Sequence, residues 1–134
     1  MNLIDFLKAE EGFRDEVYLD SKGIPTCGWG HALHVGSRVP LSACQAFLDE
    51  DLAQVEEDYH KLGLSLNPVR EAIVKAMIYQ MGLGGVRKFK NFLSSARSGD
   101  WERAAVHMLD SLWAERDSSE RAKRAAKMFR EGKV

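Results

Sequence analysis

Two carboxylates, a hydroxyl and an imidazole lie within a short glycine-rich stretch near the N-terminus: Glu11, Asp20, Thr26 and His31. Hydrolysis of a glycosidic bond needs one acid that protonates the leaving oxygen and a second carboxylate opposite it. The layout can therefore hold a glutamic acid opposite an aspartate, as glycoside hydrolysis requires. Glu11 is a candidate for the acid, and burial against apolar neighbours would favour its protonated form. Glu10 competes for this role, and Glu11 could instead be a solvated acid at the end of a helix.

Asp20 and Thr26 are the candidates for handling the attacking water. Asp20 follows an aromatic residue and opens the turn-forming segment 20–23, so its carboxylate could act on water or cap that turn. The hydroxyl group of Thr26 could hold the water. Carboxyl groups about 6.5–9.5 Å apart would fit inversion of the anomeric centre, and about 5–5.5 Å would fit retention. The sequence neighbours of His31 offer no second ligand, so no metal is expected.

Local signals predict the elements that must hold these residues. A first helix is expected over residues 3–11, with Asn2 as its N-cap and Gly12 as its stop. Residues 13–33 are expected to form short strands around the turn. The first half of the chain therefore combines one helix with a small sheet.

The remainder of the chain has the pattern of helices. Ser42 and Gln45 form a capping-box pattern at the start of a long helix that ends near Leu62. Asn67-Pro68 opens the next helix, which Gly82 breaks and whose later turns are apolar almost all round. Shorter helices are expected over three further segments, with Asp100 and Asp117 as caps and Gly132 as a stop: about 87–97, 100–113 and 119–131.

The ordered motifs of the N-terminal stretch resemble the phage-type muramidases, the family of the T-even bacteriophage lysozyme. They are Glu11-Gly12-Phe13-Arg14, Tyr18-Leu19-Asp20 and Gly23-Ile24-Pro25-Thr26-Cys27-Gly28-Trp29-Gly30-His31. The likeness resumes at residues 78–82 and continues through 101–106 and 121–124. It implies an α+β, mainly helical, lysozyme-like fold: a small sheet-containing lobe of about 13–62, joined by a long helix to an all-helical lobe of about 63–134, with the first helix packing on the second lobe.

The resemblance also implies a reaction and a role for individual residues. It implies cleavage of the β-1,4 bond between N-acetylmuramic acid and N-acetylglucosamine in peptidoglycan, without a cofactor, with Glu11 as general acid and Asp20 with Thr26 activating water. Structural support is implied for two residues, Asp51 as the partner of His31 and Arg124 near the catalytic glutamate. Contact with the substrate is implied for Gly30, His31, Leu33, Tyr79, Gln80 and His107.

Two other functions are compatible with the same fold. A lytic transglycosylase would cut the same bond without a group that activates water, and Asp20 with Thr26 argues against it. A wall-binding or regulatory domain without activity is the second alternative, against which all three catalytic residues argue. Analysis of the products would distinguish a transglycosylase from a hydrolase, and binding to the wall without turnover would indicate the non-catalytic domain.

Composition excludes several classes of protein. The 134 residues suit one domain, and no apolar run approaches the roughly 20 residues of a membrane span. The N-terminus lacks the pattern of a secretory signal, so we expect synthesis in the bacterial cytoplasm and release to the wall. Cys27 and Cys44 suggest neither a disulfide framework nor a zinc site.

Charge is unevenly distributed along the chain. Residues 1–66 carry 5 Lys and Arg against 12 Asp and Glu, whereas residues 67–134 carry 14 against 8. The basic half could hold the protein near a polyanionic cell wall, or its helices could simply be solvated. No partnership with nucleic acid is expected, and the expected state is a monomer bound to peptidoglycan glycan strands.

Overall fold

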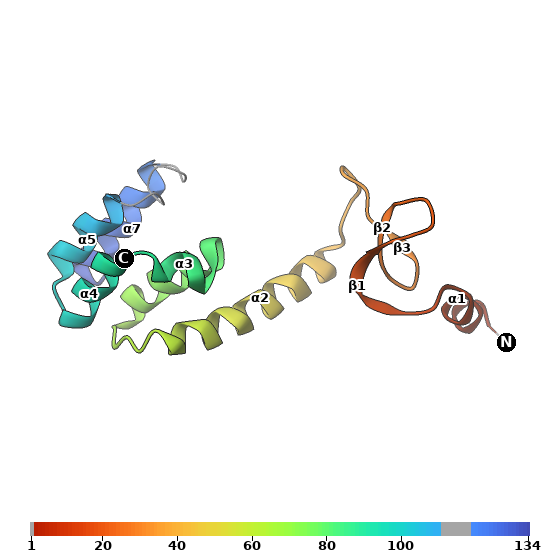
Figure 1. The fold of residues 1–134 in the computed structure, drawn as a ribbon, viewed down its shortest axis with the longest axis horizontal. Helices are drawn as coiled ribbons and strands as arrows, with labels where there is room; N and C mark the ends of the chain where they lie inside the picture. Colours follow the sequence, from red (N-terminus) through yellow and green to blue (C-terminus); the bar gives the residue numbers. More distant parts are fainter. Residues whose placement is uncertain (1, 111–118) are drawn as a thin grey trace. The chain divides into compact units, whose positions relative to one another are not determined.

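The computed structural model describes residues 2–110 and 119–134. The chain divides into two compact units, Met1–Cys44 and Gln45–Val134. The first unit holds helix α1 (Leu3–Glu11) and a small sheet, and the second is built from helices (Figure 1). The expected α+β, mainly helical fold is confirmed. The lobe boundary near residue 62 and the packing of the first helix on the second lobe stay predictions.

Helix α1 has the ends that its sequence predicts. The side-chain oxygen of Asn2 accepts a hydrogen bond from the N–H of Asp5 at 2.9 Å, so Asn2 is the N-cap. Gly12 ends the helix at a φ of 68°, and its N–H donates to the carbonyl of Lys8. This cap fixes Glu11 as the last residue of the helix.

A three-stranded antiparallel sheet follows α1, in the order β1 (Arg14–Leu19), β2 (Pro25–Gly28) and β3 (His31–Ala32). Thr26 lies in the central strand, opposite Tyr18 on one side and Ala32 on the other. The expectation of short strands between residues 13 and 33 is confirmed. The sheet places Asp20 directly after β1 and Thr26 within β2.

Five helices of the second part of the chain are described. Their bounds are α2 (Leu41–Lys61), α3 (Pro68–Arg87), α4 (Lys90–Ser98), α5 (Trp101–Leu109) and α7 (Ser119–Glu131). Within this unit, α5 packs against both α4 and α7, and α3 also packs against α7. Asp117 and the predicted helix end near residue 113 lie outside the described residues.

Several of the predicted helix signals are confirmed and one is wrong. Asn67 and Asp100 cap α3 and α5 as expected. The predicted capping box at Ser42 is wrong, because the carbonyl of Pro40 accepts from the N–H of Cys44 and the helix therefore starts before Ser42. Gly82 interrupts α3 as expected, because its backbone is non-helical (φ 75°, ψ 166°), and the helix resumes beyond it to Arg87.

The buried apolar core of the described residues lies in the second unit. Phe92 of α4 and Phe129 of α7 are fully buried, and their ring centroids lie 5.2 Å apart. The ring of Trp101 meets Phe129 edge-on at 5.9 Å. Met77 and Val74 bring α3 into the same core, and Val55 and Tyr59 bring in α2, so the five helices described in this unit share one apolar centre.

Arg70 joins the start of α3 to the end of α7. Its Nε donates to the carbonyl of Phe129 at 2.7 Å, and one terminal nitrogen donates to the carbonyl of Arg130 at 3.0 Å. Its guanidinium stacks on the ring of Trp101 at 4.0 Å, and burial lowers the pKa of Arg70. The side chain thereby satisfies carbonyls at the C-terminus of α7, which have no partner within the helix.

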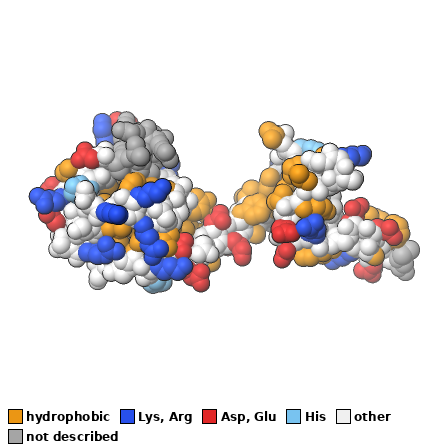
Figure 2. All heavy atoms as spheres, in the orientation of Figure 1, with side chains coloured by type: hydrophobic (Ala, Val, Ile, Leu, Met, Phe, Trp, Pro, Cys, Tyr) orange, Lys and Arg blue, Asp and Glu red, His pale blue; other side chains and the backbone are white. Residues whose placement is uncertain are grey.

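Charged side chains cover much of the helical unit. Figure 2 shows Lys and Arg side chains spread over its visible face, in agreement with the excess of basic residues after residue 66. Among the described residues, no helix has the length and apolar character needed to cross a membrane.

We predict that Arg70→Met destabilises the protein. The variant loses two charge-assisted hydrogen bonds to carbonyls and the stacking on Trp101, so the free energy of unfolding should fall by about 2–3 kcal/mol. Urea unfolding measures this difference. Lys127→Met, which removes an exposed cation from α7, is the control; equal effects of the two substitutions would contradict the role of Arg70.

Candidate active site

Glu11 lies at the C-terminal end of α1 with its side chain exposed. Its carboxylate lies against the backbone of Gly30, in the turn between β2 and β3. Two elements of the first unit thus meet at the predicted general acid. Burial of Glu11 among apolar neighbours, which the sequence analysis expected to favour the acid form, is not seen among the described residues.

Asp20 uses one carboxylate oxygen to build a turn. Its Oδ1 accepts hydrogen bonds from the N–H groups of Lys22 and Ile24, both at 2.8 Å. The backbone closes the same turn, because Gly23 donates to the carbonyl of Asp20. No hydrogen bond to the second oxygen, Oδ2, is present among the described residues. The carboxylate is half-buried and rigidly oriented, with one oxygen left for other chemistry.

Thr26 is linked to Asp20 through a shared neighbour. Its side chain is 4% exposed, and its Oγ1 donates to the carbonyl of Ile24 at 2.8 Å. Since the N–H of Ile24 donates to Asp20, one residue fixes both side chains. The hydrogen of the hydroxyl is already used, so Oγ1 can serve a ligand only as an acceptor.

The other predicted residues of the first unit lie in or next to β3. His31 is exposed, and Leu33 is half-buried with its N–H donating to the carbonyl of Pro25. Within residues 2–110 and 119–134, no three His, Cys, Asp or Glu side chains are grouped so that they could hold a metal ion. Asp51 and Arg124 lie in the second unit and are exposed, and their pairing with His31 and with Glu11 stays a prediction.

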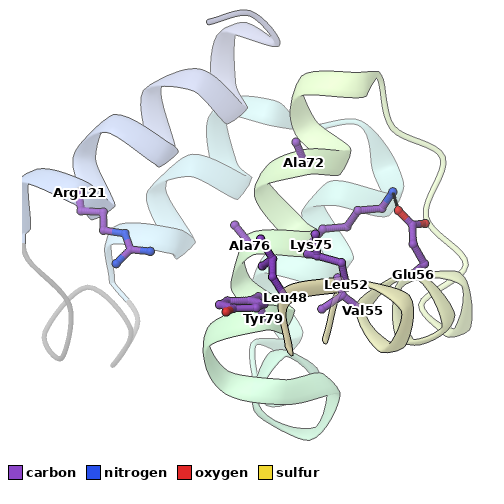
Figure 3. A pocket seen from close by; sticks show the side chains of 9 residues that line it. All are labelled: Leu48, Leu52, Val55, Glu56, Ala72, Lys75, Ala76, Tyr79 and Arg121. Carbon is purple, nitrogen blue, oxygen red and sulfur yellow. Dashed lines mark hydrogen bonds and ion pairs between the residues drawn. The ribbon is translucent and has the colours of Figure 1, made fainter. Parts of the chain in front are cut away.

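Tyr79 lines an apolar pocket of about 380 Å³ in the second unit (Figure 3). The lining residues come from α2, α3 and α7: Leu48, Leu52, Val55, Glu56, Ala72, Lys75, Ala76, Tyr79 and Arg121. Half of the Tyr79 surface is exposed, and Gln80, the next residue, is exposed as well. An aromatic ring beside an apolar hollow suits contact with the apolar face of a sugar.

Lys75, which lines this pocket, forms ion pairs with two glutamates. Its Nζ lies 2.6 Å from Glu56 Oε1 of α2 and 2.7 Å from Glu71 Oε1 of α3, and Figure 3 shows the ion pair with Glu56. The hydrogen bonds to Glu56 and then to Glu71 raise the pKa of Lys75. Burial, followed by the charge of Glu71, raises the pKa of the neighbouring Tyr59.

His107 lines a separate, more polar pocket of about 390 Å³. Its lining residues are Lys88, Phe89, Lys90, Asn91, Phe92, His107 and Asp110. His107 was predicted from the sequence as a residue that contacts the substrate, whereas Lys88, Lys90 and Asn91 were not. A run of cationic and amide side chains at the start of a helix is the signal that could have drawn attention to them.

Comparison with known proteins gives a consistent set of similarities. A family model of phage lysozyme matches residues 8–126. The pre-baseplate central spike protein Gp5 of Enterobacteria phage T4 is 30% identical over 143 aligned positions, which cover 84% of this chain and 25% of the spike protein. The chain therefore spans about a quarter of the length of that relative.

Two further relatives match over more of their own length. The probable T4-type lysozyme 1 of Dictyostelium discoideum is 25% identical over 140 positions, covering 81% of this chain and 82% of the relative. The endolysin of Salmonella phage P22 is 35% identical over 89 positions, covering 60% of this chain and 61% of the endolysin.

We predict a loss of stability at alkaline pH that depends on Lys75. Because its pKa is raised in the folded state above the ordinary 10.5, its stabilising contribution is complete below 10.5 and is lost as pH rises through the folded value. The raised pKa of Tyr59 has the same effect, since the unfolded chain loses this proton first and stability therefore falls above the ordinary pKa of 10.0. Urea unfolding at about pH 9 and about pH 11 measures the free energy of unfolding. Between these two pH values it should decrease less for Lys75→Met than for the wild type.

The control for this measurement is Lys61→Met, which removes an exposed cation of α2 paired with Asp58 at 3.5 Å. It should keep the pH dependence of the wild type. An unchanged pH dependence in Lys75→Met would show that the contacts with Glu56 and Glu71 do not stabilise the charged form.

Proposed function

The chain belongs to the phage lysozyme family, and on that premise we propose that it is an N-acetylmuramidase that cleaves the β-1,4 bond between N-acetylmuramic acid and N-acetylglucosamine. Family membership supports the coarser function, a glycosidase that hydrolyses peptidoglycan. The observation that carries the finer proposal is the arrangement of the Asp20 carboxylate. Its Oδ1 accepts hydrogen bonds from two backbone N–H groups, and its Oδ2 makes no hydrogen bond among the described residues.

Glu11 is the general acid of the proposed reaction. Its proton passes to the glycosidic oxygen as the bond to the anomeric carbon breaks, which produces a neutral hydroxyl on the leaving sugar. The side chain suits this role because it is exposed at the end of a helix, where a glycan can reach it. Glu10 lies at the preceding position of the same helix and is also exposed, so the two residues can be separated by experiment.

Asp20 and Thr26 orient the attacking water. A water that donates one hydrogen bond to Oδ2 of Asp20 and the other to Oγ1 of Thr26 keeps a lone pair for the anomeric carbon. The hydrogen bond from Oγ1 to the carbonyl of Ile24 supports this assignment, because it leaves Oγ1 as an acceptor. Asp20 then takes the proton that the water loses.

The second unit supplies the proposed contacts with the glycan. Tyr79 offers an exposed aromatic ring beside an apolar pocket, and Gln80 follows it with an exposed amide group. His107 lines a pocket whose two lysines suit the carboxylates of peptidoglycan. We take the functional partner to be the peptidoglycan strand, bound by a monomer without nucleic acid.

We predict that Glu11→Gln abolishes most of the lytic activity and that Glu10→Gln retains it. Gln has nearly the shape of Glu but cannot donate the acidic proton, so the rate should fall by about 10²- to 10⁴-fold. The measurement is the clearing of chloroform-treated Gram-negative cells by each purified protein. A reversed order of the two variants would assign the acid to Glu10.

Analysis of the released fragments tests the reaction itself. Hydrolysis leaves muramic ends that borohydride can reduce, whereas anhydro-muramic ends would indicate a lytic transglycosylase. If wild type and Glu11→Gln both bind cell walls and neither clears them, the protein is a wall-binding module and the catalytic proposal is wrong.

We predict that Asp20→Asn and Asp20→Ala both lose lytic activity to the same extent, but that Asp20→Ala is the less stable of the two. Asn keeps an oxygen that can accept from Lys22 and Ile24, so the turn should survive while the base is lost. Ala leaves both N–H groups without this acceptor and should cost about 1 kcal/mol in addition. Cell clearing and urea unfolding measure the two effects; an active Asp20→Asn would exclude Asp20 as the base.

A further inference from the structure

Gly30 lies where no other residue fits without moving the proposed acid. A β-carbon at position 30 would lie 2.9 Å from Cδ and 3.3 Å from Cγ of Glu11, and closer still to Oε2. Separations below about 3 Å between such atoms require one of them to move. The obstructed atoms belong to the end of a flexible side chain, so the carboxylate would move aside while the backbone stays in place.

A second contact holds the same two elements together. Lys8 precedes Glu11 by one helical turn, and its Nζ lies 4.4 Å from the centroid of the Trp29 ring. Residues three apart lie on one face of a helix. That face of α1 therefore meets two consecutive residues of the turn, with Lys8 on Trp29 and Glu11 on Gly30. The ring of Phe13 packs on Trp29 at 4.7 Å and adds to this junction.

We propose that Gly30 is a positioning residue for the general acid: its missing side chain lets the Glu11 carboxylate occupy the place from which it protonates the glycosidic oxygen. This inference rests on the proposed function. It gives Gly30 a different role from the substrate contact that the sequence resemblance implies, because the observed neighbour of Gly30 is the acid itself. Displacement of a reacting group by about 1 Å can cost about 10²-fold in rate.

Gly28 provides a matched control within the same hairpin. Both glycines have a positive φ, 64° at Gly28 and 68° at Gly30, so Ala is strained to a similar extent at either position. A β-carbon at Gly28 would meet nothing within 4 Å. The comparison of Gly28→Ala with Gly30→Ala therefore isolates the contact with Glu11 from the backbone strain.

The experiment measures stability, steady-state kinetics on soluble uncrosslinked peptidoglycan, and the ¹³C signal of the Glu11 carboxyl carbon. Gly30→Ala should melt close to Gly28→Ala, while its kcat falls by about 10²-fold at nearly unchanged KM. The carboxyl signal of Glu11 should shift in Gly30→Ala and stay in place in Gly28→Ala. Equal loss of kcat in both variants, or an unmoved signal in Gly30→Ala, would overturn the proposal.

Two further results, an inactive wild type and an unstable Gly30→Ala, are also interpretable. If wild type lacks hydrolytic activity, the proposed function fails, and the Glu11 signal alone then decides whether Gly30 positions the carboxylate. If Gly30→Ala melts far below Gly28→Ala, both substitutions are repeated in a Glu11→Ala background. Disappearance of the difference in that background traces the cost to the Glu11 contact and supports the proposal; persistence of the difference overturns it.

Discussion

The close approach of the last turn of α1 to the turn between β2 and β3 is the constraint on which the first unit depends. Gly12 ends the helix directly after Glu11, and the bare backbone of Gly30 leaves room for the Glu11 carboxylate, while Lys8 contacts the ring of Trp29. Both glycines adopt a positive φ that other residues rarely take. The position of the Glu11 carboxylate, the proposed general acid, therefore depends on the absence of a side chain at Gly30.

The two units achieve order by different physical means. The buried apolar side chains of the described residues begin at Val55 and belong to the second unit. In the first unit, Thr26 is the buried polar residue, and the shape depends on the strand pairs and on the turn at Asp20. Such a unit fixes a few polar groups through the backbone, whereas the helical unit gains its stability from packing.

Local chemistry explains which parts of the fold the sequence could predict. The caps at Asn2, Asn67 and Asp100 each rest on a side chain and an N–H three residues apart, so a short window contains the whole interaction. Ser42 failed as a cap because Pro40 already accepts the first helical bond. The approach of Gly30 to Glu11 joins residues nineteen positions apart, and no local pattern encodes it.

Asp20 shows why two interpretations of one residue need not compete. The sequence left open whether its carboxylate caps a turn or acts on water, and the structure assigns the turn to Oδ1 alone. A carboxylate held by two N–H groups through one oxygen loses rotational freedom, so the direction of the other oxygen is fixed before a substrate arrives. Pre-orientation of this kind lowers the entropic cost of reaching the transition state. The turn is therefore part of the proposed base, because it determines where Oδ2 points.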